Sequence, residues 1–368
     1  MTPIFLYGTL RHLPHLEIVA GRAGAGIAAS LPGHAAFHAG EAPYPRLEAA
    51  PGETAPGLLV EAEDVLARLA FYEGGYGYAL EPVEVMTAEG PRAARTFRAG
   101  LGVAAAGAPW SLEAWVARFG ALTCHLAREA MGFFGEITAE ELARRMPAMG
   151  VRAQSRLLAE AGPHPEPLAP LPSPDVEILT EGMPYAQFFS VTEAELRHRR
   201  FDGTMGRVVN RASFLSGDAV VVLPYDPVRD RVLLIEQFRM GPYFRGDPHR
   251  FLIEAIAGRV DPGETPEDAA RREAEEEASL PLGALHEVSR CYPSPGAMSE
   301  FFHIYVAIAD LPDAAAGLGG AVAEDEDIRS SILDYAAFEA RLDGGGLNVA
   351  PLVIAGHWLA RNRRRLRG

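Results

Sequence analysis

The chain has 368 residues, 48% hydrophobic and 23% charged, which predicts two or three globular domains with sizeable cores. Its formal net charge of −15 argues against non-specific binding of nucleic acid, which depends on basic surface. Two distant cysteines exclude a disulfide framework. The sequence has no long apolar run and no basic leader, so we expect neither a membrane span nor a signal peptide, and we expect a cytoplasmic protein.

The first hundred residues mix short strands with Gly and Pro turns. The stretch "FLYGTLR" (5–11) reads as a buried strand that enters a tight turn, "GLLVEAED" (57–64) as a later strand, and "LARLAFYEGGYGYALEPVEV" (66–85) as the segment after it. Together they resemble the gamma-glutamylcyclotransferase-like fold, a small barrel with flanking helices.

The resemblance implies a pocket in which backbone amides bind a substrate carboxylate. The residues that would form it are Tyr7, Gly8, Thr9 and Leu10. Glu73 matches the family's acid–base glutamate, which moves a proton as an amine attacks the gamma-carbonyl. If Glu73 faces such a pocket, its pKa should be raised by partial burial. Alternatively, Glu73 beside Gly74 and Gly75 only caps a turn.

The next stretch reads as helices over 110–160, with a capping box at Thr138 and Glu141. Six prolines in 162–175 favour an extended, semi-rigid spacer. The expected organisation is a cyclotransferase-like domain at 1–105, a helical connector at 106–161, a Pro-rich linker at 162–175 and a second domain at 176–368.

In the second domain, strand-like runs flank a turn at 226–230, and a helix is predicted from Pro266, with Thr265 as its N-cap. Helical spacing places Glu273, Glu276 and Glu277 on one face. One interpretation is a solvated face with Arg271–Glu275 and Arg272–Glu276 ion pairs. The other is a site for a hard cation, because clustered carboxylates suit Mg²⁺ or Mn²⁺.

The spacing of the residues before and within this helix favours the cation site over the solvated face. Gly258 is followed by five residues, Glu264, seven residues and then "REAEEEASL" (272–280), which resembles the Nudix box. Ala274 and Ser279 depart from the pattern, which has a bulky apolar residue and glycine there. The resemblance implies an α/β/α sandwich, so the whole chain should be of α+β and α/β class. It also implies Mg²⁺ (or Mn²⁺) held by Glu273, Glu277 and the Ala257 carbonyl.

Other residues of the box receive roles in the same way. Glu276 lies on the metal-facing side and is assigned to catalysis, Arg272 should hold the carboxylates apart, and Glu264 should tie the loop to the helix. The acidic stretch "AEDED" (323–327) reads either as an acidic surface loop or as part of the site. By resemblance Glu324 is the base that activates water, and Glu326 is a further metal ligand. In an extended segment these two share a face that Asp325 does not.

Four segments outside the box carry a further resemblance: "QFFSVTEAELRHRRFDG" (187–203), "VVLPYDPVRDRVLLIEQFR" (221–239), "SPGAMSE" (294–300) and "EDEDIR" (324–329). Together with Pro295, fifteen residues after Leu280, they resemble the ADP-ribose pyrophosphatase branch. The resemblance places Arg211 and Arg239 on phosphate or ribose oxygens, which the guanidinium fork suits. Phe188 would stack on adenine, unless it packs in the core, and Glu300 would accept from ribose hydroxyls. The family exchanges the equivalent of 176–215 across a homodimer, so a homodimer is implied.

The expected activity is Mg²⁺-dependent hydrolysis of ADP-ribose to AMP and ribose 5-phosphate. No nucleic-acid or membrane partner is expected, and the basic run at 361–367 reads as the end of a last helix, where cations suit the helix dipole. Two alternatives stay open. One is a diphosphatase for another nucleotide sugar. The other is a ligand-sensing or stress-resistance protein without turnover, since such fusions are sometimes labelled tellurite-resistance proteins.

Overall fold

The computed structural model describes residues 2–24, 26–61, 65–100, 106–169, 175–320 and 326–368. The chain divides into two compact units. The first is Met1–His164 with Ala186–Phe188, and the second is Pro165–Tyr185 with Phe189–Gly368. Each unit is described by itself. No helix in the described ranges has the length and apolar character that crossing a membrane requires.

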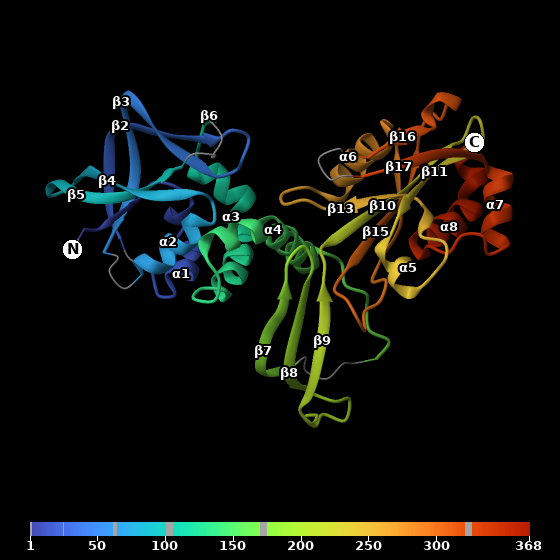
Figure 1. The fold of residues 1–368 in the computed structure, drawn as a ribbon, viewed down its shortest axis with the longest axis horizontal. Helices are drawn as coiled ribbons and strands as arrows, with labels where there is room; N and C mark the ends of the chain where they lie inside the picture. The colour runs from blue at the N-terminus through green and yellow to red at the C-terminus, as the bar shows by residue number, and fades with distance from the viewer. Residues whose placement is uncertain (1, 25, 62–64, 101–105, 170–174, 321–325) are drawn as a thin grey trace. The chain divides into compact units, whose positions relative to one another are not determined.

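The first unit contains a small closed barrel (Figure 1). Its strands are β1 (Ile4–Leu6), β2 (Ile27–Ala39), β3 (Pro45–Val60), β4 (Tyr78–Thr87), β5 (Gly90–Ala99) and β6 (Ala106–Pro109). They pair in the order β3-β1-β5-β4-β2-β6, and the additional pairing of β2 with β3 closes the ring. Phe5 of β1 is fully buried at its centre. A Cβ atom at Gly57 would overlap the Phe5 ring, so the neighbouring strand needs glycine there.

Helices cover this barrel. They are α1 (Leu13–Ala20), α2 (Leu66–Gly74), α3 (Leu112–Gly132) and α4 (Ala139–Ala161), with a short 3₁₀ turn, η1 (Thr9–Arg11). The hydroxyl of Thr138 accepts from the Glu141 amide at 3.2 Å, as the capping pattern predicts. A buried ion pair between Arg152 and Glu129 joins α4 to α3. The helices expected as a connector therefore lie in the same compact unit as the barrel.

The second unit is a sheet between helices. Its strands are β10 (Asp218–Asp226), β11 (Arg231–Phe238), β12 (Phe251–Glu254), β13 (Ile256–Arg259), β14 (Leu285–Cys291), β15 (Phe301–Ile308), β16 (Gly317–Gly319) and β17 (Ile328–Asp334). Six follow the order β14-β15-β10-β11-β17-β16, while β12 pairs with β11 and β13 with β10. Its helices are α5 (Met240–Arg245), α6 (Pro266–Ala278), α7 (Tyr335–Asp343) and α8 (Ala350–Arg367).

Alternation along the strands separates the two faces of this sheet. Val221 and Leu223 share a core with Phe338 of α7 and Leu352 of α8. Gly258 of β13 pairs with Val220, the residue before Val221 in β10. Because successive residues of a strand face opposite sides, Val220 and Gly258 lie on the other face of the sheet, where α6 packs. This arrangement is the predicted α/β/α sandwich (Figure 1).

Two parts of the second unit differ from or extend the sequence-based expectation. The Gly- and Ala-rich stretch 313–325 reads from its sequence as a flexible loop, but its described residues, 313–320, include η2 (Asp313–Ala315) and β16, which pairs with β17. The basic C-terminal run ends α8 as predicted, and Arg363 and Arg367 both pair with Asp230 in the β10–β11 turn.

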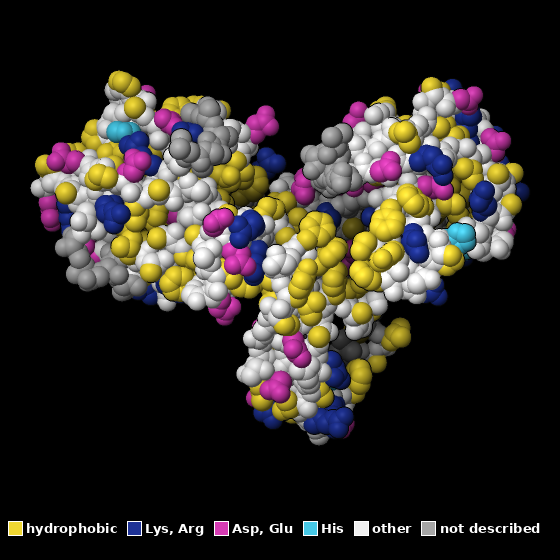
Figure 2. Space-filling model, in the orientation of Figure 1, with side chains coloured by type: hydrophobic (Ala, Val, Ile, Leu, Met, Phe, Trp, Pro, Cys, Tyr) yellow, Lys and Arg dark blue, Asp and Glu magenta, His cyan; other side chains and the backbone are white. Residues whose placement is uncertain are grey.

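A three-stranded antiparallel sheet precedes the sandwich. It consists of β7 (Val176–Ala186), β8 (Ser190–His198) and β9 (Val209–Leu215). Apolar side chains gather over it (Figure 2), and its exposed members include Val176, Ile178, Leu179 and Tyr185. The end of β9 is fixed to the sandwich, because Phe214 exchanges backbone hydrogen bonds with Ala297 and Ser299 at 2.9 and 3.0 Å.

Candidate active site

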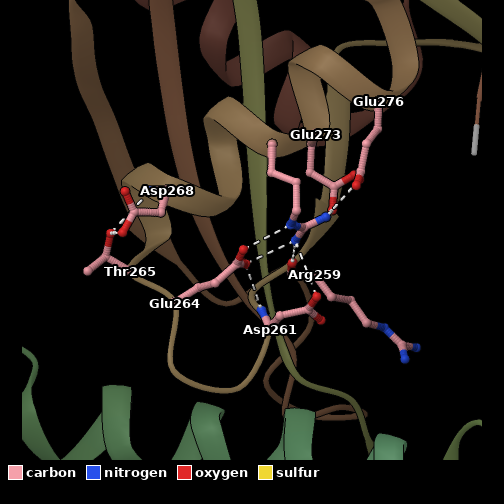
Figure 3. A network of polar contacts seen from close by, with 8 residues as sticks. Arg259, Asp261, Glu264, Thr265, Asp268, Glu273 and Glu276 are labelled. Atoms are coloured by element: carbon pink, nitrogen blue, oxygen red, sulfur yellow. Dashed lines mark hydrogen bonds and ion pairs between the residues drawn. The ribbon is translucent and has the colours of Figure 1, made fainter. Parts of the chain in front are cut away.

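The site in the second unit is built on the loop that enters α6 (Figure 3). Thr265 is the N-cap, and its hydroxyl accepts from the Asp268 amide at 3.2 Å. Pro266 occupies the first helical turn, where its missing N–H costs nothing. Glu264 accepts from the Asp261 amide at 3.2 Å. The loop and the helix start are thus fixed by the residues that the sequence predicts.

Arg272 connects several parts of this region through hydrogen bonds. It donates to Glu264 at 3.0 Å and to the Arg259 carbonyl at 2.9 Å, which joins helix, loop and β13 (Figure 3). Its Nη1 donates to Glu273 at 2.7 Å and to Glu276 at 2.9 Å. The structural roles expected of Arg272 and Glu264 are confirmed.

The other ion pair considered from the sequence is not the one that forms. The solvated-face interpretation pairs Arg271 with Glu275, but the Arg271 guanidinium donates to the Leu282 and Gly283 carbonyls at 2.6 and 3.0 Å. These bonds fix the chain after α6 instead of neutralising the helix surface.

Two carboxylates of α6 are pressed against β13. Glu277 is only 2% exposed, and its Oε2 accepts from the Ala257 amide at 3.3 Å. A Cβ atom at Gly258 would overlap the Glu273 carboxyl group, so any other residue would push that group away. This close approach explains why the box requires glycine at 258.

The charged forms of these two carboxyl groups are electrostatically unfavourable. Burial, followed by repulsion from Glu273, raises the pKa of Glu277 to about 9. Burial likewise raises the pKa of Glu273 to about 7, and the charge of Glu326 adds to the increase at both residues. In the described part of the chain the side chains form no ready cluster of three or more metal-ligating groups. The uncompensated charge is nevertheless what a divalent cation would neutralise, so the donor set fits Mg²⁺ or Mn²⁺.

The end of β16 lies against the end of α6. A Cβ atom at Gly319 would overlap the Glu277 carbonyl oxygen, and one at Gly320 would lie 2.9 Å from Glu326. Glu326 therefore lies near the C-terminal end of α6, which carries Glu277. Glu324, the expected base, lies outside the described residues.

The expected substrate side contains one arginine that is held by a partner the sequence did not indicate. Arg239 forms a bidentate pair with buried Glu254, at 2.9 and 2.8 Å. Its charge acts on both Glu277 and Glu300, so it lies between the box and the loop that carries Glu300. Glu300 accepts from the Ser216 hydroxyl at 3.5 Å, and burial raises its pKa.

Arg259 was also missed by the sequence analysis. Its guanidinium lies 5.2 Å from the Phe189 ring centroid, and its charge acts on Glu300. Phe189 contacts Phe214 with ring centroids 4.8 Å apart. The signal available in the sequence was Arg259's position directly after the box glycine.

Phe188 and Arg211 both have exposed side chains. Phe188 is 67% exposed, and the neighbouring Phe189 makes the contact with Arg259. Arg211 is exposed on β9, where it donates to the Asn210 carbonyl at 2.7 Å. Their roles in substrate binding stay predictions.

The first unit brings Glu73 of α2 among tyrosines. Tyr7 directly follows β1, Gly8 caps η1, and Thr9 and Leu10 lie in that turn. Burial raises the pKa of Glu73 to about 8. Its backbone carbonyl, not its side chain, closes the following turn by accepting from the Tyr76 amide at 3.0 Å. The side-chain environment therefore favours the acid–base interpretation over the turn cap.

Ser279, where the box usually has glycine, is the C-cap of α6 with φ +48°, in the left-handed region. We expect Ser279→Gly to raise the free energy of unfolding of the second unit by about 1 kcal/mol, because glycine has no Cβ penalty there. Urea titration would measure it. Ser279→Ala is the control and should give no gain; an equal gain would show that the backbone angle is not the cause.

Comparisons with known proteins agree with this geometry. Residues 215–343 match the NUDIX domain, and residues 4–115 match the family described as Gamma-glutamyl cyclotransferase, AIG2-like. The chain belongs to the Nudix family: it is a Nudix hydrolase that carries an AIG2-like cyclotransferase domain at its N-terminal end.

Three curated relatives cover the second half of the chain. An ADP-ribose pyrophosphatase of Escherichia coli (strain K12) is 39% identical over 193 residues, 52% of this chain and 91% of the relative. One of Haemophilus influenzae is 35% identical over 194 residues, 52% and 89% of the two chains. A GDP-mannose pyrophosphatase of Cronobacter sakazakii is 34% identical over 180 residues, 49% and 92%.

Proposed function

We propose that the second unit hydrolyses ADP-ribose to AMP and ribose 5-phosphate in the presence of Mg²⁺. The observation that carries this proposal is the pair of buried carboxylates, Glu273 and Glu277, packed against β13 with their pKa values raised. Relatives named for ADP-ribose support the substrate. A relative named for GDP-mannose makes another nucleotide sugar the second candidate.

The residues divide the work as follows. Glu273, Glu277, Glu326 and the Ala257 carbonyl would hold the cation, which neutralises diphosphate oxygens and orients water. Glu276, paired with Arg272 at the edge of this group, would support the same charge balance. Glu324 accepts the proton of the attacking water. Beyond the box, Arg239 binds phosphate oxygen and Glu300 accepts from ribose hydroxyls.

A turnover screen tests the substrate. Purified full-length protein with saturating Mg²⁺ should cleave ADP-ribose with a higher kcat/KM than GDP-mannose or ADP-glucose. The products should be AMP and ribose 5-phosphate. Preference for a sugar nucleotide would transfer the assignment to the second candidate. Binding of ADP-ribose without cleavage of any nucleotide would favour the ligand-sensing alternative.

We also propose a homodimer formed through the three-stranded sheet. Its exposed apolar residues, Val176, Ile178, Leu179 and Tyr185, favour burial by a second copy. Both cysteines are free, which suits the reducing cytoplasm as the location.

The second unit has its own hydrophobic core, formed between the sheet and α7 and α8. A chain shortened to begin at Asp175 should therefore fold, dimerise and keep at least half of the ADP-ribose hydrolysis rate. Size-exclusion chromatography and turnover would measure both properties. A soluble, inactive product would show that the first unit contributes to the reaction, and an insoluble one that the boundary is wrong.

For the first unit we propose cyclisation of gamma-glutamyl amines, with Glu73 as acid–base. The supporting observation is its raised pKa among tyrosines, which suits proton transfer near neutral pH. Release of 5-oxoproline from gamma-glutamyl amines, lost in Glu73→Gln, would test it.

A further inference from the structure

His15 of α1 is a buried histidine that neither proposed reaction uses directly. It is only 1% exposed, and Trp115 stacks on its ring with centroids 6.0 Å apart. Its Nδ1 lies 3.4 Å from the Thr9 carbonyl oxygen, and its Nε2 lies 2.9 Å from the Tyr72 hydroxyl. Burial lowers its pKa to about 4, so the ring is neutral at neutral pH.

These partners determine where the protons lie. A carbonyl oxygen only accepts, so Nδ1 of His15 carries the hydrogen that faces Thr9. The neutral ring has no second N–H, so Nε2 accepts from the Tyr72 hydroxyl. Tyr72 has then used its one proton. In its 3.3 Å contact with Tyr76, the hydroxyl of Tyr76 must therefore donate.

The same holds for a third phenol near Glu73. Tyr78 donates to the Pro45 carbonyl at 2.7 Å. Burial raises the pKa values of Tyr72, Tyr76 and Tyr78, and the negative charge of Glu73, the residue after Tyr72 in α2, raises them further. His12 acts on His15, and the other titratable groups that act on the phenols are Tyr44, Arg46 and Cys124. Glu73 and Tyr78 also act on Tyr7, as does Arg98.

We propose that His15 is a positioning residue, which fixes the direction of these hydrogen bonds so that Tyr72 and Tyr76, like Tyr78, have no proton left to donate to Glu73. Two consequences follow. The Glu73 carboxylate receives no hydrogen bond from these phenols and stays basic. A ligand group that contacts these phenol oxygens must be a donor, and a primary amine supplies both the N–H groups and the proton that Glu73 takes.

This inference rests on the proposed role of Glu73 in the first unit, but its first test needs no turnover. In full-length protein labelled with ¹⁵N-histidine, His15 should show a protonated Nδ1 and an unprotonated Nε2. It should keep this tautomer from pH 8 to pH 5, because its pKa lies lower. The opposite tautomer, or a charged ring at pH 6, would overturn the proposal.

A second test reads the effect at Glu73 by ¹³C titration of its carboxyl, assigned with Glu73→Gln. His15→Phe removes the acceptor and frees the Tyr72 proton, so the acid dissociation constant of Glu73 should rise about tenfold or more. His15→Gln, whose amide can both accept and donate, should retain the wild-type midpoint. His12→Phe is the matched control, since His12 also contacts Trp115, at 6.3 Å, outside the chain of hydrogen bonds.

The outcomes are separable from the proposed cyclisation. An unchanged Glu73 midpoint in folded His15→Phe overturns the positioning role, whatever the turnover. Failure to release 5-oxoproline, with the expected tautomer and the shifted midpoint, contradicts the cyclotransferase activity alone. If His15→Phe does not fold, the wild-type tautomer still decides.

Discussion

Glu277→Gln should reduce Mg²⁺-dependent ADP-ribose hydrolysis by about 10²-fold or more at millimolar Mg²⁺, because a cation contributes several kcal/mol of charge stabilisation. The substitution keeps the shape of the side chain and an oxygen that can accept from the Ala257 amide. It removes only the charge. Steady-state kinetics over a range of Mg²⁺ concentrations would measure the loss, and higher Mg²⁺ should recover part of it.

The helix offers a matched control for this prediction. Glu275 lies two residues earlier on α6 and is exposed, away from the face that packs on β13. Glu275→Gln should leave both kcat and the Mg²⁺ dependence near wild type. Equal losses from the two substitutions would mean that total helix charge matters, not the buried carboxylate.

In the absence of a divalent cation, Glu277→Gln should also be more stable to unfolding than the wild-type protein. A carboxylate buried beside Glu273 carries an electrostatic cost, which its raised pKa of about 9 reflects. Since the folded pKa exceeds the unfolded value, wild-type stability should fall as the pH rises from about 4 to about 9, and Glu277→Gln should lose part of this dependence. Chemical denaturation in the presence of a chelator would measure both slopes.

Glu324→Gln should lower kcat for ADP-ribose by about 10²–10⁴-fold while KM changes little, because removal of a general base affects proton transfer more than binding. Asp325→Asn is the neighbouring control and should retain near-normal kcat. Pre-steady-state and steady-state kinetics together would separate chemistry from product release. Equal damage from both substitutions would reassign the base and make the whole acidic segment responsible.

The local features of the box could be predicted from the sequence because each depends on near neighbours. Thr265, Pro266 and Glu264 act within a few positions of one another, and helical spacing places the carboxylates on one face. The closed barrel and the sandwich followed from resemblance to known families. The parallel pairing of β1 with β5, which joins Ile4 to Arg95, has no marker in the sequence.

What the sequence could not provide are partners set by tertiary packing. Glu254 holds Arg239 because β12 lies beside β11, a pairing that no local pattern specifies. Helix α5 contains Gly241 and Pro242, which are weak helix formers, so its pattern does not predict a helix. Arg259 reaches Phe189 only after β8 and β13 are placed in the fold.

The clasp between the β10–β11 turn and the end of α8 bears on the order of folding during synthesis. Asp230 accepts from Arg363, 133 positions later, at 2.8 Å, and also pairs with Arg367 in the last turn of α8. A growing chain cannot form this clasp until the last turn of α8 has been synthesised and has left the ribosome. The first unit contains no such late contribution among its described elements, so it can complete its core while the second is still being made. Nascent second units should therefore be the form that chaperones and proteases encounter.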